Sequence, residues 1–348
     1  MNPYALSMMV MSLGLGTTIT FASSHWLYAW LGMEINMLAI LPLMMQDQHP
    51  RAVEATTKYF LTQATAATLL LFSTMMNAWF TGSWDIQHHP NQLTMTAIFM
   101  SLGFKVGLAP MHFWVPEVMQ GLNPYTGLVL ATWQKLAPMV LIFQISQGMN
   151  YSLTIALGLL SALVGSWGAL NQTQMRKILA YSSIAHMGWM IIVLKYAPHI
   201  MLLTLMIYIT LTSVVFLAIS VMDTMKLNTL AMAWAKNPMF QISIFISVLS
   251  LGGLPPLTGF VPKWLILQEM ANQDLTVAAT MMLMASVLSL YFYIRISYTT
   301  ALTIPPNTVN TKTPWRMKTM SVAMPISVAV VLAAMMMPMT PALLAMVK

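Results

Sequence analysis

Six ionisable side chains lie inside apolar stretches of this sequence. They are Glu34, Lys105, His112, Lys135, His186 and Lys263. A charge near the centre of a lipid bilayer costs about 2.5 to 3.5 kcal/mol on insertion scales, so a protein keeps one there only where it faces protein or water. Buried lysine, carboxylate and histidine side chains can take up and release protons, whereas arginine hardly ever deprotonates. The pattern predicts a path for protons inside a membrane protein.

Depth within the apolar stretch distinguishes some of these residues from lysines that lie at the membrane interface. A lysine near a helix end can lift its ammonium group to the interface along its four-carbon stem. Lys135 stands eleven residues after Pro124 and eleven before Ser146, about 16 Å from either end at the rise of an α-helix. Its side chain cannot span that distance. Lys105 and Glu34 are similarly deep, so we expect all three to face protein or water.

The other three residues leave two interpretations open. Lys263 lies nearer the end of its apolar stretch, where the ammonium group could reach the interface. His112 and His186 could relay protons, or each could be a neutral side chain that hydrogen bonds to a neighbouring helix.

The composition excludes a water-soluble globular protein. Hydrophobic residues make up 58% of the 348 residues, charged residues 7%, and the mean hydropathy is +0.72. Such a chain has too few polar residues to cover a surface in water. The absence of cysteine excludes disulfides, cysteine-ligated iron–sulfur clusters and thiol catalysis. The 37 methionines indicate either a genetic code like that of animal mitochondria or an unusually plastic, methionine-rich core.

Hydropathy over windows of about 20 residues predicts an all-α polytopic membrane protein with about eleven transmembrane helices. The apolar segments span residues 3–22, 25–46, 57–80, 93–119, 124–146, 151–170, 175–195, 199–222, 240–268, 276–300 and 319–346. The longest connections, 223–238 and 301–318, are too short for a soluble domain. We therefore expect a single membrane domain over residues 1–348.

Basic residues between the segments predict the orientation, because lysine and arginine are retained on the side where the chain is made. If alternate loops share a face with the N-terminus, that face holds Arg51, Lys58, Arg176, Lys177, Lys226, Lys236, Arg295, Lys312, Arg316 and Lys318. The opposite face holds Lys195 and Lys348. This places the N-terminus in the mitochondrial matrix and the C-terminus in the intermembrane space. Anionic lipids such as cardiolipin would be sufficient partners for the basic loops, and no nucleic acid is needed to explain the net charge of +7.

An internal repeat marks two of the segments. Residues 107–117 and 253–263 match at five of eleven positions, at an offset of 146. Pro110 in the first copy, and Pro255 and Pro256 in the second, should break their helices, because proline removes a backbone hydrogen bond. Interrupted helices in corresponding halves are typical of transport sites. The pattern predicts two inverted five-helix repeats, residues 1–148 and 149–302, followed by a C-terminal loop and transmembrane helix at 303–348.

The motifs around these breaks resemble a known family, the Mrp-antiporter-related membrane subunits of respiratory complex I, the NADH:ubiquinone oxidoreductase. The resemblance is carried by residues 104–107, 110, 112–114, 116, 176–189 and 252–260, and it extends over essentially the whole chain. Longer members of the family have fourteen helices, and this chain lacks the first three.

The resemblance implies roles for the buried residues. Glu34 and Lys105 would form the ion pair of a first half-channel, Lys135 would pass protons toward the second, and Lys263 would be the outlet lysine. His112 and His186 would be intermediate relays with water. The chain would then be a proton-translocating subunit of NADH:ubiquinone reductase, located in the mitochondrial inner membrane.

The same resemblance implies partners and cofactors outside this chain. The partners would be other membrane-arm subunits of complex I, including the antiporter-like chain 4 and chain 4L. NADH, FMN, iron–sulfur clusters and ubiquinone would bind elsewhere in the complex, and we expect this chain to bind no cofactor or metal. The adjacent His88 and His89 are interpreted as an inert loop pair. A stand-alone cation/proton antiporter is the alternative function, and a purely structural membrane spacer is a third.

Overall fold

The computed structural model describes residues 1–348 except 1, 47, 88–90, 236–237, 302–322 and 348. The described residues form fifteen α-helices and two short 3-10 helices, with no strand among them. The all-α class predicted from the sequence is therefore confirmed. The basic residues Lys312, Arg316 and Lys318 and the pair His88–His89 lie outside the described residues.

Seven of the described helices are long and apolar enough to cross a membrane by length and composition. They are α1 (Pro3–Ala22), α2 (Trp26–Met44), α3 (Pro50–Thr81), the combined α6–α7 segment (Pro124–Gln144), α8 (Tyr151–Ala169), α10 (Pro198–Met222) and α14 (Thr276–Ala301). The chain is thus a helical membrane protein. The count of eleven crossings stays a prediction.

Proline marks the beginning of several helices. It stands at the start of α1, α3, α6, α10 and α12, at Pro3, Pro50, Pro124, Pro198 and Pro238. Its fixed φ suits the first helical turn, where its missing N–H would have no intrahelical partner anyway. At α1 and α3 the preceding side chains, Asn2 and His49, also accept a hydrogen bond from a backbone N–H of the first turn. These local signals fix where the helices begin.

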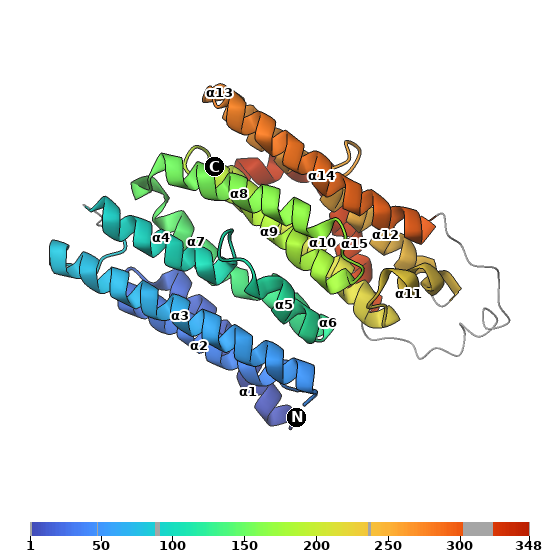
Figure 1. The fold of residues 1–348 in the computed structure, drawn as a ribbon, viewed down its shortest axis with the longest axis horizontal. Coiled ribbons are helices and arrows are strands. Elements are labelled where there is room, and N and C mark those ends of the chain that lie inside the picture. The colour runs from blue at the N-terminus through green and yellow to red at the C-terminus, as the bar shows by residue number, and fades with distance from the viewer. Residues whose placement is uncertain (1, 47, 88–90, 236–237, 302–322, 348) are drawn as a thin grey trace. The chain divides into compact units, whose positions relative to one another are not determined.

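The chain divides into two compact units, Met1–Gly158 and Leu159–Lys348. In the first unit α1 packs on α2, α2 on α3, and α3 on α4 (Gln92–Val106) and α5 (Trp114–Gly121). Helix α7 (Trp133–Gln144) contacts α1, α2, α4 and α6 (Pro124–Ala131). The long blue helices α1 to α3 run beside one another in Figure 1.

The second unit is organised around α10. This helix contacts α9 (Met175–Val193), α12 (Pro238–Gly252), α13 (Phe260–Asn272) and α15 (Ala323–Val347). Helix α14 packs on α12 and α13, and the short α11 (Leu227–Ala231) contacts α14. In Figure 1 these elements run from green through orange to red.

Three local details differ from the sequence expectations. Helix α3 begins at Pro50 rather than near residue 57, because charged residues in its first turns lower the hydropathy without ending the helix. The connection 223–238 contains α11 and a 3-10 helix at Met232–Ala235, both too short for a window of about 20 residues to detect. The segment 124–146, predicted as one transmembrane helix, is interrupted at Thr132 between α6 and α7.

The interruption at Thr132 has a backbone cause. Thr132 adopts φ −113° and ψ −68°, and Pro138 lies inside α7. Proline donates no hydrogen bond to the carbonyl four residues earlier, at Gln134, and its ring crowds that carbonyl. The distortion therefore falls in the preceding turn, as is usual for a proline kink. Lys135 follows this bend directly.

Helices α1 and α2 approach closely at two glycines. A Cβ atom added to Gly16 would lie 2.7 Å from the backbone oxygen of Gly32, and one added to Gly32 would lie 2.7 Å from the backbone oxygen of Gly16. The same Gly16 Cβ would lie 2.4 Å from Oδ1 of Asn36. Small residues at a crossing let two membrane helices pack backbone to backbone.

This contact generates a matched pair of substitutions. Gly16→Ala should destabilise the first unit by about 1 to 3 kcal/mol, because the added methyl group cannot be accommodated against backbone atoms. Gly14→Ala, two residues away on the same helix, should be tolerated, since a Cβ there meets nothing within 4 Å. Native electrophoresis and the temperature of irreversible inactivation would measure both. Equal stability of the two variants would contradict the close contact between α1 and α2.

Candidate functional site

Glu34 and Lys105 form an ion pair inside the first unit. Glu34 lies on α2 and Lys105 in the last turn of α4, and the Lys105 Nζ to Glu34 Oε1 distance is 4.0 Å. Their side chains are 4% and 17% exposed for Lys105 and Glu34 respectively. Among the described residues, Glu34 Oε1 has no hydrogen-bond partner. The two groups are thus close enough to attract each other strongly at low dielectric, yet are not locked by a hydrogen bond.

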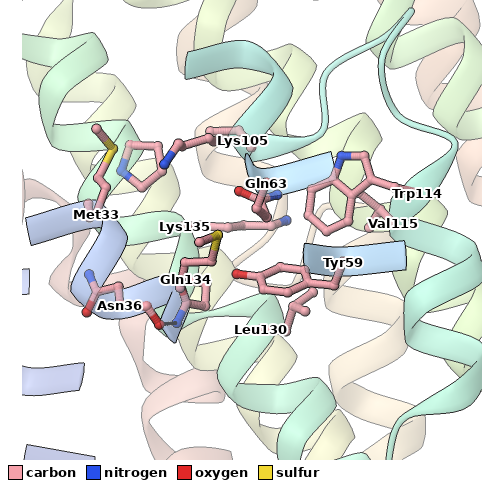
Figure 2. Close-up of a pocket in the computed structure, with 14 residues that line it drawn as sticks. Met33, Asn36, Tyr59, Gln63, Lys105, Trp114, Val115, Leu130, Gln134 and Lys135 are labelled. Atoms are coloured by element: carbon pink, nitrogen blue, oxygen red, sulfur yellow. Dashed lines mark hydrogen bonds between the residues drawn. The ribbon is translucent and has the colours of Figure 1, made fainter. Parts of the chain in front are cut away.

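Lys135 shares a small cavity with Lys105. Figure 2 shows both lysines among the side chains that line this space, which has a volume of about 20 Å³. That is enough for about one water molecule. Lys135 is 6% exposed and Lys105 is 8% exposed as whole residues. The sequence predicted Lys135 as a deep residue, but nothing in its spacing placed it beside the cavity of Lys105.

The rest of the cavity wall is partly polar. Asn36 from α2, Tyr59 and Gln63 from α3, and Gln134 from α7 line it together with the two lysines. Sequence analysis missed these residues because it considered ionisable groups alone. A search for isolated amides in apolar helices would have found Asn36 and Gln63, since buried polar groups need partners.

The chain leaves the helical conformation immediately after Lys105. Helix α4 ends at Val106, Gly107 adopts φ +87°, and α5 begins at Trp114. A Cβ at residue 107 would lie 2.4 Å from Val115 Cγ2, so both the positive φ and the packing favour glycine. Near the break, the Phe104 carbonyl accepts a hydrogen bond of 3.2 Å from Trp114 Nε1 and another of 3.2 Å from the Gly107 N–H.

His112 lies within this break but does not line the cavity. It is 5% exposed, and its ring centroid is 4.4 Å from that of Phe113. Its Nδ1 has no hydrogen-bond partner in the part of the chain that the structure describes. His112 is therefore placed near the ion pair in sequence but apart from the cavity of Lys105 and Lys135.

A second break occurs at matching positions in the second unit. Helices α4 and α12 are both 15 residues long. Both ends of α12 lie 146 residues after those of α4, and α13 begins 146 residues after α5 begins. Gly253, which aligns with Gly107, adopts φ +82°. Pro110 lies within the first break, and Pro255 and Pro256 lie within the second. The repeated motif thus ends one helix and begins the next at matching positions in both copies.

Lys263 lies after the second break and faces helix-end carbonyls. Its Nζ donates hydrogen bonds to the carbonyl of Gly252 at 2.8 Å and to that of Leu251 at 3.4 Å. These carbonyls end α12, where the helix dipole favours a positive charge. Lys263 also lines a cavity of about 20 Å³ together with His186 and Tyr208, whose ring centroids are 5.5 Å apart. The described lining of this cavity contains no carboxylate.

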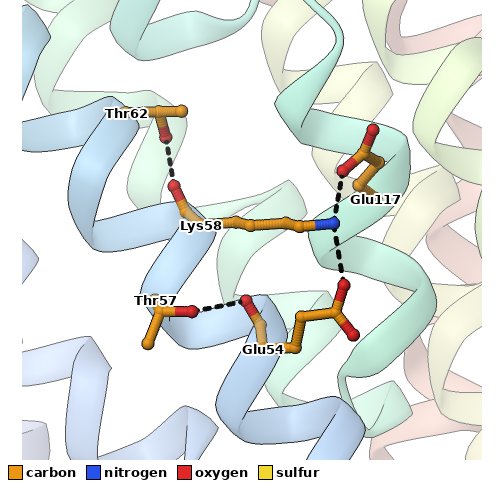
Figure 3. A network of polar contacts seen from close by, with 5 residues as sticks. All are labelled: Glu54, Thr57, Lys58, Thr62 and Glu117. Carbon is orange, nitrogen blue, oxygen red and sulfur yellow. Dashed lines mark hydrogen bonds and ion pairs between the residues drawn. The ribbon is translucent and has the colours of Figure 1, made fainter.

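The two lysines at the breaks are consequently not equivalent. Lys105 precedes its break and pairs with a carboxylate, whereas Lys263 follows its break and pairs with carbonyls. Glu117 occupies the position that aligns with Lys263. Figure 3 shows Glu117 joined to Lys58 by an ion pair of 2.8 Å, with Glu54 2.9 Å from the same ammonium group.

This exposed network connects α5 to α3. The side chains of Lys58, Glu117 and Glu54 are 42%, 55% and 64% exposed. Solvent and salt screen such pairs, so the network contributes little to stability. Exposure distinguishes this network from the buried Glu34–Lys105 pair, which solvent screens less.

Metal binding has no candidate in the described residues, where no three His, Asp or Glu side chains gather as possible ligands. Two lysines, one carboxylate and several neutral polar groups can exchange protons and hold water.

Comparison with known families assigns the chain. Residues 23–289 match the profile of the NADH:quinone oxidoreductase/Mrp antiporter transmembrane family, and residues 290–344 match that of the NADH dehydrogenase subunit 2 C-terminus. The sequence is 58% identical over 346 residues to NADH-ubiquinone oxidoreductase chain 2 of Formosania lacustris, covering 99% of both chains. The chain belongs to the NADH-ubiquinone oxidoreductase chain 2 family. The family resemblance predicted from the motifs is confirmed.

Further relatives of this family agree. The chain is 58% identical over 344 residues to chain 2 of Carassius auratus and 52% identical over 348 residues to chain 2 of Latimeria chalumnae. The alignments cover 99% and 100% of this chain, and the same shares of the two relatives.

Solved structures show the same fold. A chain of respiratory complex I from Thermus thermophilus with bound aureothin matches with a TM-score of 0.88 and 27% identity, over 99% of this chain and 80% of that one. The Mrp complex from Dietzia sp. matches with a TM-score of 0.86 and 16% identity, over 97% and 76% of the two chains. The second likeness concerns the fold alone.

Proposed function

We propose that this chain is a proton-translocating subunit of the membrane arm of respiratory complex I. In that role it couples electron transfer from NADH to ubiquinone to the movement of protons across the mitochondrial inner membrane. The main support is the first unit, in which Glu34, Lys105 and Lys135 are brought together around one ion pair and one cavity. Membership of the chain 2 family supports the same assignment.

The Glu34–Lys105 pair provides a way to load and release a proton. Burial disfavours the charged form of Lys105, and the nearby Glu34 carboxylate favours it. A movement of Glu34 away from Lys105 weakens that support, so the lysine releases its proton. Because Lys105 and Glu34 are separated by 4.0 Å and are not hydrogen bonded, a small movement of Glu34 is sufficient to shift Lys105 between its charged and neutral forms. Lys135 lines the same cavity and can accept the proton.

Lys263 and His186 provide a corresponding group in the second unit. The helix-end carbonyls of Leu251 and Gly252 stabilise a protonated Lys263 without a carboxylate. His186, on the same cavity, can exchange protons with it through Tyr208 or water. We assign Lys263 as the outlet lysine, with His112 and His186 as relays.

The proposed architecture follows from this function. It has eleven crossings, in two inverted five-helix repeats at 1–148 and 149–302, with a C-terminal segment at 303–348. The N-terminus lies in the matrix and the C-terminus in the intermembrane space. Other membrane-arm subunits, including chain 4 and chain 4L, would be neighbours, and cardiolipin would bind at the basic matrix loops. NADH, FMN, iron–sulfur clusters and ubiquinone would bind elsewhere in the complex.

A stand-alone cation/proton antiporter is the second candidate, and the fold likeness to the Mrp complex favours it. The chain 2 relatives match essentially the full length of this sequence at 52% to 58% identity, whereas the Mrp chain is 16% identical. We therefore prefer the complex I assignment. Purification after mild solubilisation separates the two, because a complex I subunit should remain with flavin and iron–sulfur subunits, whereas an antiporter should be recovered without them.

The proposed orientation predicts which loops a reagent can reach. In sealed, oriented inner-membrane vesicles, an impermeant label should reach residues 301–318 from the matrix side and residues 81–92 from the opposite side. The experiment uses single introduced cysteines, since the chain has none of its own. Labelling of both loops from one side would contradict the orientation.

Removing either member of the buried ion pair should reduce proton pumping. Glu34→Gln and Lys105→Met each remove one partner of a coupled titration, and pumping linked to quinone reduction should fall by about tenfold or more. Lys226→Met removes a lysine on the exposed connection before α11 and serves as the control for lost charge. Membrane potential and NADH-driven quinone reduction would be measured at equal assembly. Normal pumping in both buried variants would remove the pair from the mechanism.

A further inference from the structure

Two buried amides lie on the cavity that Lys105 and Lys135 share. Asn36 on α2 is 2% exposed and Gln63 on α3 is 5% exposed. Oδ1 and Nδ2 of Asn36 and Nε2 of Gln63 have no hydrogen-bond partner among the described residues. In Figure 2 the Gln63 side chain appears between those of Lys105 and Lys135. Buried polar atoms are nearly always hydrogen bonded, so these amides indicate a polar ligand in the cavity.

Neighbouring helices contact Asn36 closely. The absence of a side chain at Gly16 leaves the space that Oδ1 of Asn36 occupies against α1. The backbone carbonyl of Asn36 accepts a hydrogen bond of 3.3 Å from Gln134 Nε2, which ties α2 to α7 directly beside Lys135. The side chain of Asn36 thus packs against α1, and its backbone is hydrogen bonded to α7. The cavity wall at Asn36 is therefore formed by close contacts between helices rather than by loosely packed side chains.

We propose that Asn36 and Gln63 are positioning residues that hold one water molecule in this cavity, and that this water carries the proton between Lys105 and Lys135. The inference rests on the proposed function and extends it to two residues that are not ionisable. The cavity volume of about 20 Å³ suits about one water molecule, which needs two to four polar partners. The two amides and the two lysines all line this cavity and are its candidate partners for the water.

Amide side chains suit this task because each has both a donor and an acceptor. In the transfer, the ammonium group of one lysine gives a proton to the water oxygen while the water gives another proton to the neutral amine of the other lysine. One N–H bond breaks and one forms, and the water is regenerated in the reversed orientation. An amide can bind the water in either orientation, whereas a carboxylate accepts only. The two amides can therefore bind the water again after each transfer without gaining or losing charge.

Methionines in the cavity wall make the water directly testable. Met33 and Met37 line the cavity and are 4% and 5% exposed, whereas Met44 and Met95 are 3% and 2% exposed and do not line it. Millisecond X-ray radiolysis of the assembled complex generates hydroxyl radicals from bound water, and these oxidise adjacent methionines. We expect Met33 and Met37 to be oxidised about tenfold faster than the equally buried Met44 and Met95.

Substitutions then connect the water to the amides. Gln63→Met preserves size without polarity, and combined with Asn36→Leu it should reduce oxidation of Met33 and Met37 to the level of Met44. The same double variant should pump more slowly at normal assembly, with an increased solvent deuterium isotope effect. Gln144→Met is the control, because Gln144 lies on α7 but outside this cavity. It should change neither the oxidation pattern nor pumping.

Oxidation of Met33 and Met37 no faster than that of Met44 and Met95 would overturn the proposal. So would oxidation that persists in the double variant, or oxidation that is lost while pumping and its isotope effect stay normal. The oxidation pattern of the unmodified complex does not depend on pumping. A wild-type pattern as expected, together with normal pumping by Lys105→Met, would contradict the proposed function and leave the water site standing.

Discussion

Lys105 and Lys135 approach one small cavity from two different helices, deep in a chain with few charges to compensate them. Removing an ammonium group from water is costly unless hydrogen bonds or an opposite charge replace its hydration. Glu34 supplies the opposite charge for Lys105, and the surrounding amides supply polarity for the cavity. The packing of α1, α2, α3, α4 and α7 is arranged around this requirement. The close contact at Gly16, for instance, both brings α1 onto α2 and leaves room for Asn36.

At the interrupted helices, backbone carbonyls also need hydrogen-bond partners within the protein. Helix α4 ends just after Lys105, and Trp114 donates a hydrogen bond to the Phe104 carbonyl near that end. Ending α12 frees carbonyls that Lys263 itself satisfies. The two units thus interrupt a helix at matching positions of the repeat, and each stabilises its buried lysine in a different way. The protonation of a lysine held by a carboxylate depends on the position of that carboxylate. The protonation of a lysine held by helix-end carbonyls depends on the geometry of the break.

Much of this could be predicted from the amino-acid sequence. Hydropathy predicts the membrane helices, and the repeat around Gly107 and Gly253 indicates where two of them are interrupted, because proline and glycine act through the local backbone. The depth of Lys135 follows from counting residues. What could not be predicted depends on contacts between helices. The shared cavity of Lys105 and Lys135 and the roles of Asn36 and Gln63 both arise from the packing of segments distant in sequence.

The central claim is that Lys135 exchanges a proton during turnover rather than only supplying a positive charge. Comparing Lys135→Arg with Lys135→Met in the assembled complex tests it most directly, with membrane potential and NADH-driven quinone reduction measured together and assembly checked by native electrophoresis. The account predicts that both variants assemble and that proton pumping falls sharply in both, because arginine keeps the charge but does not release a proton. Full pumping by the Lys135→Arg complex would contradict the account.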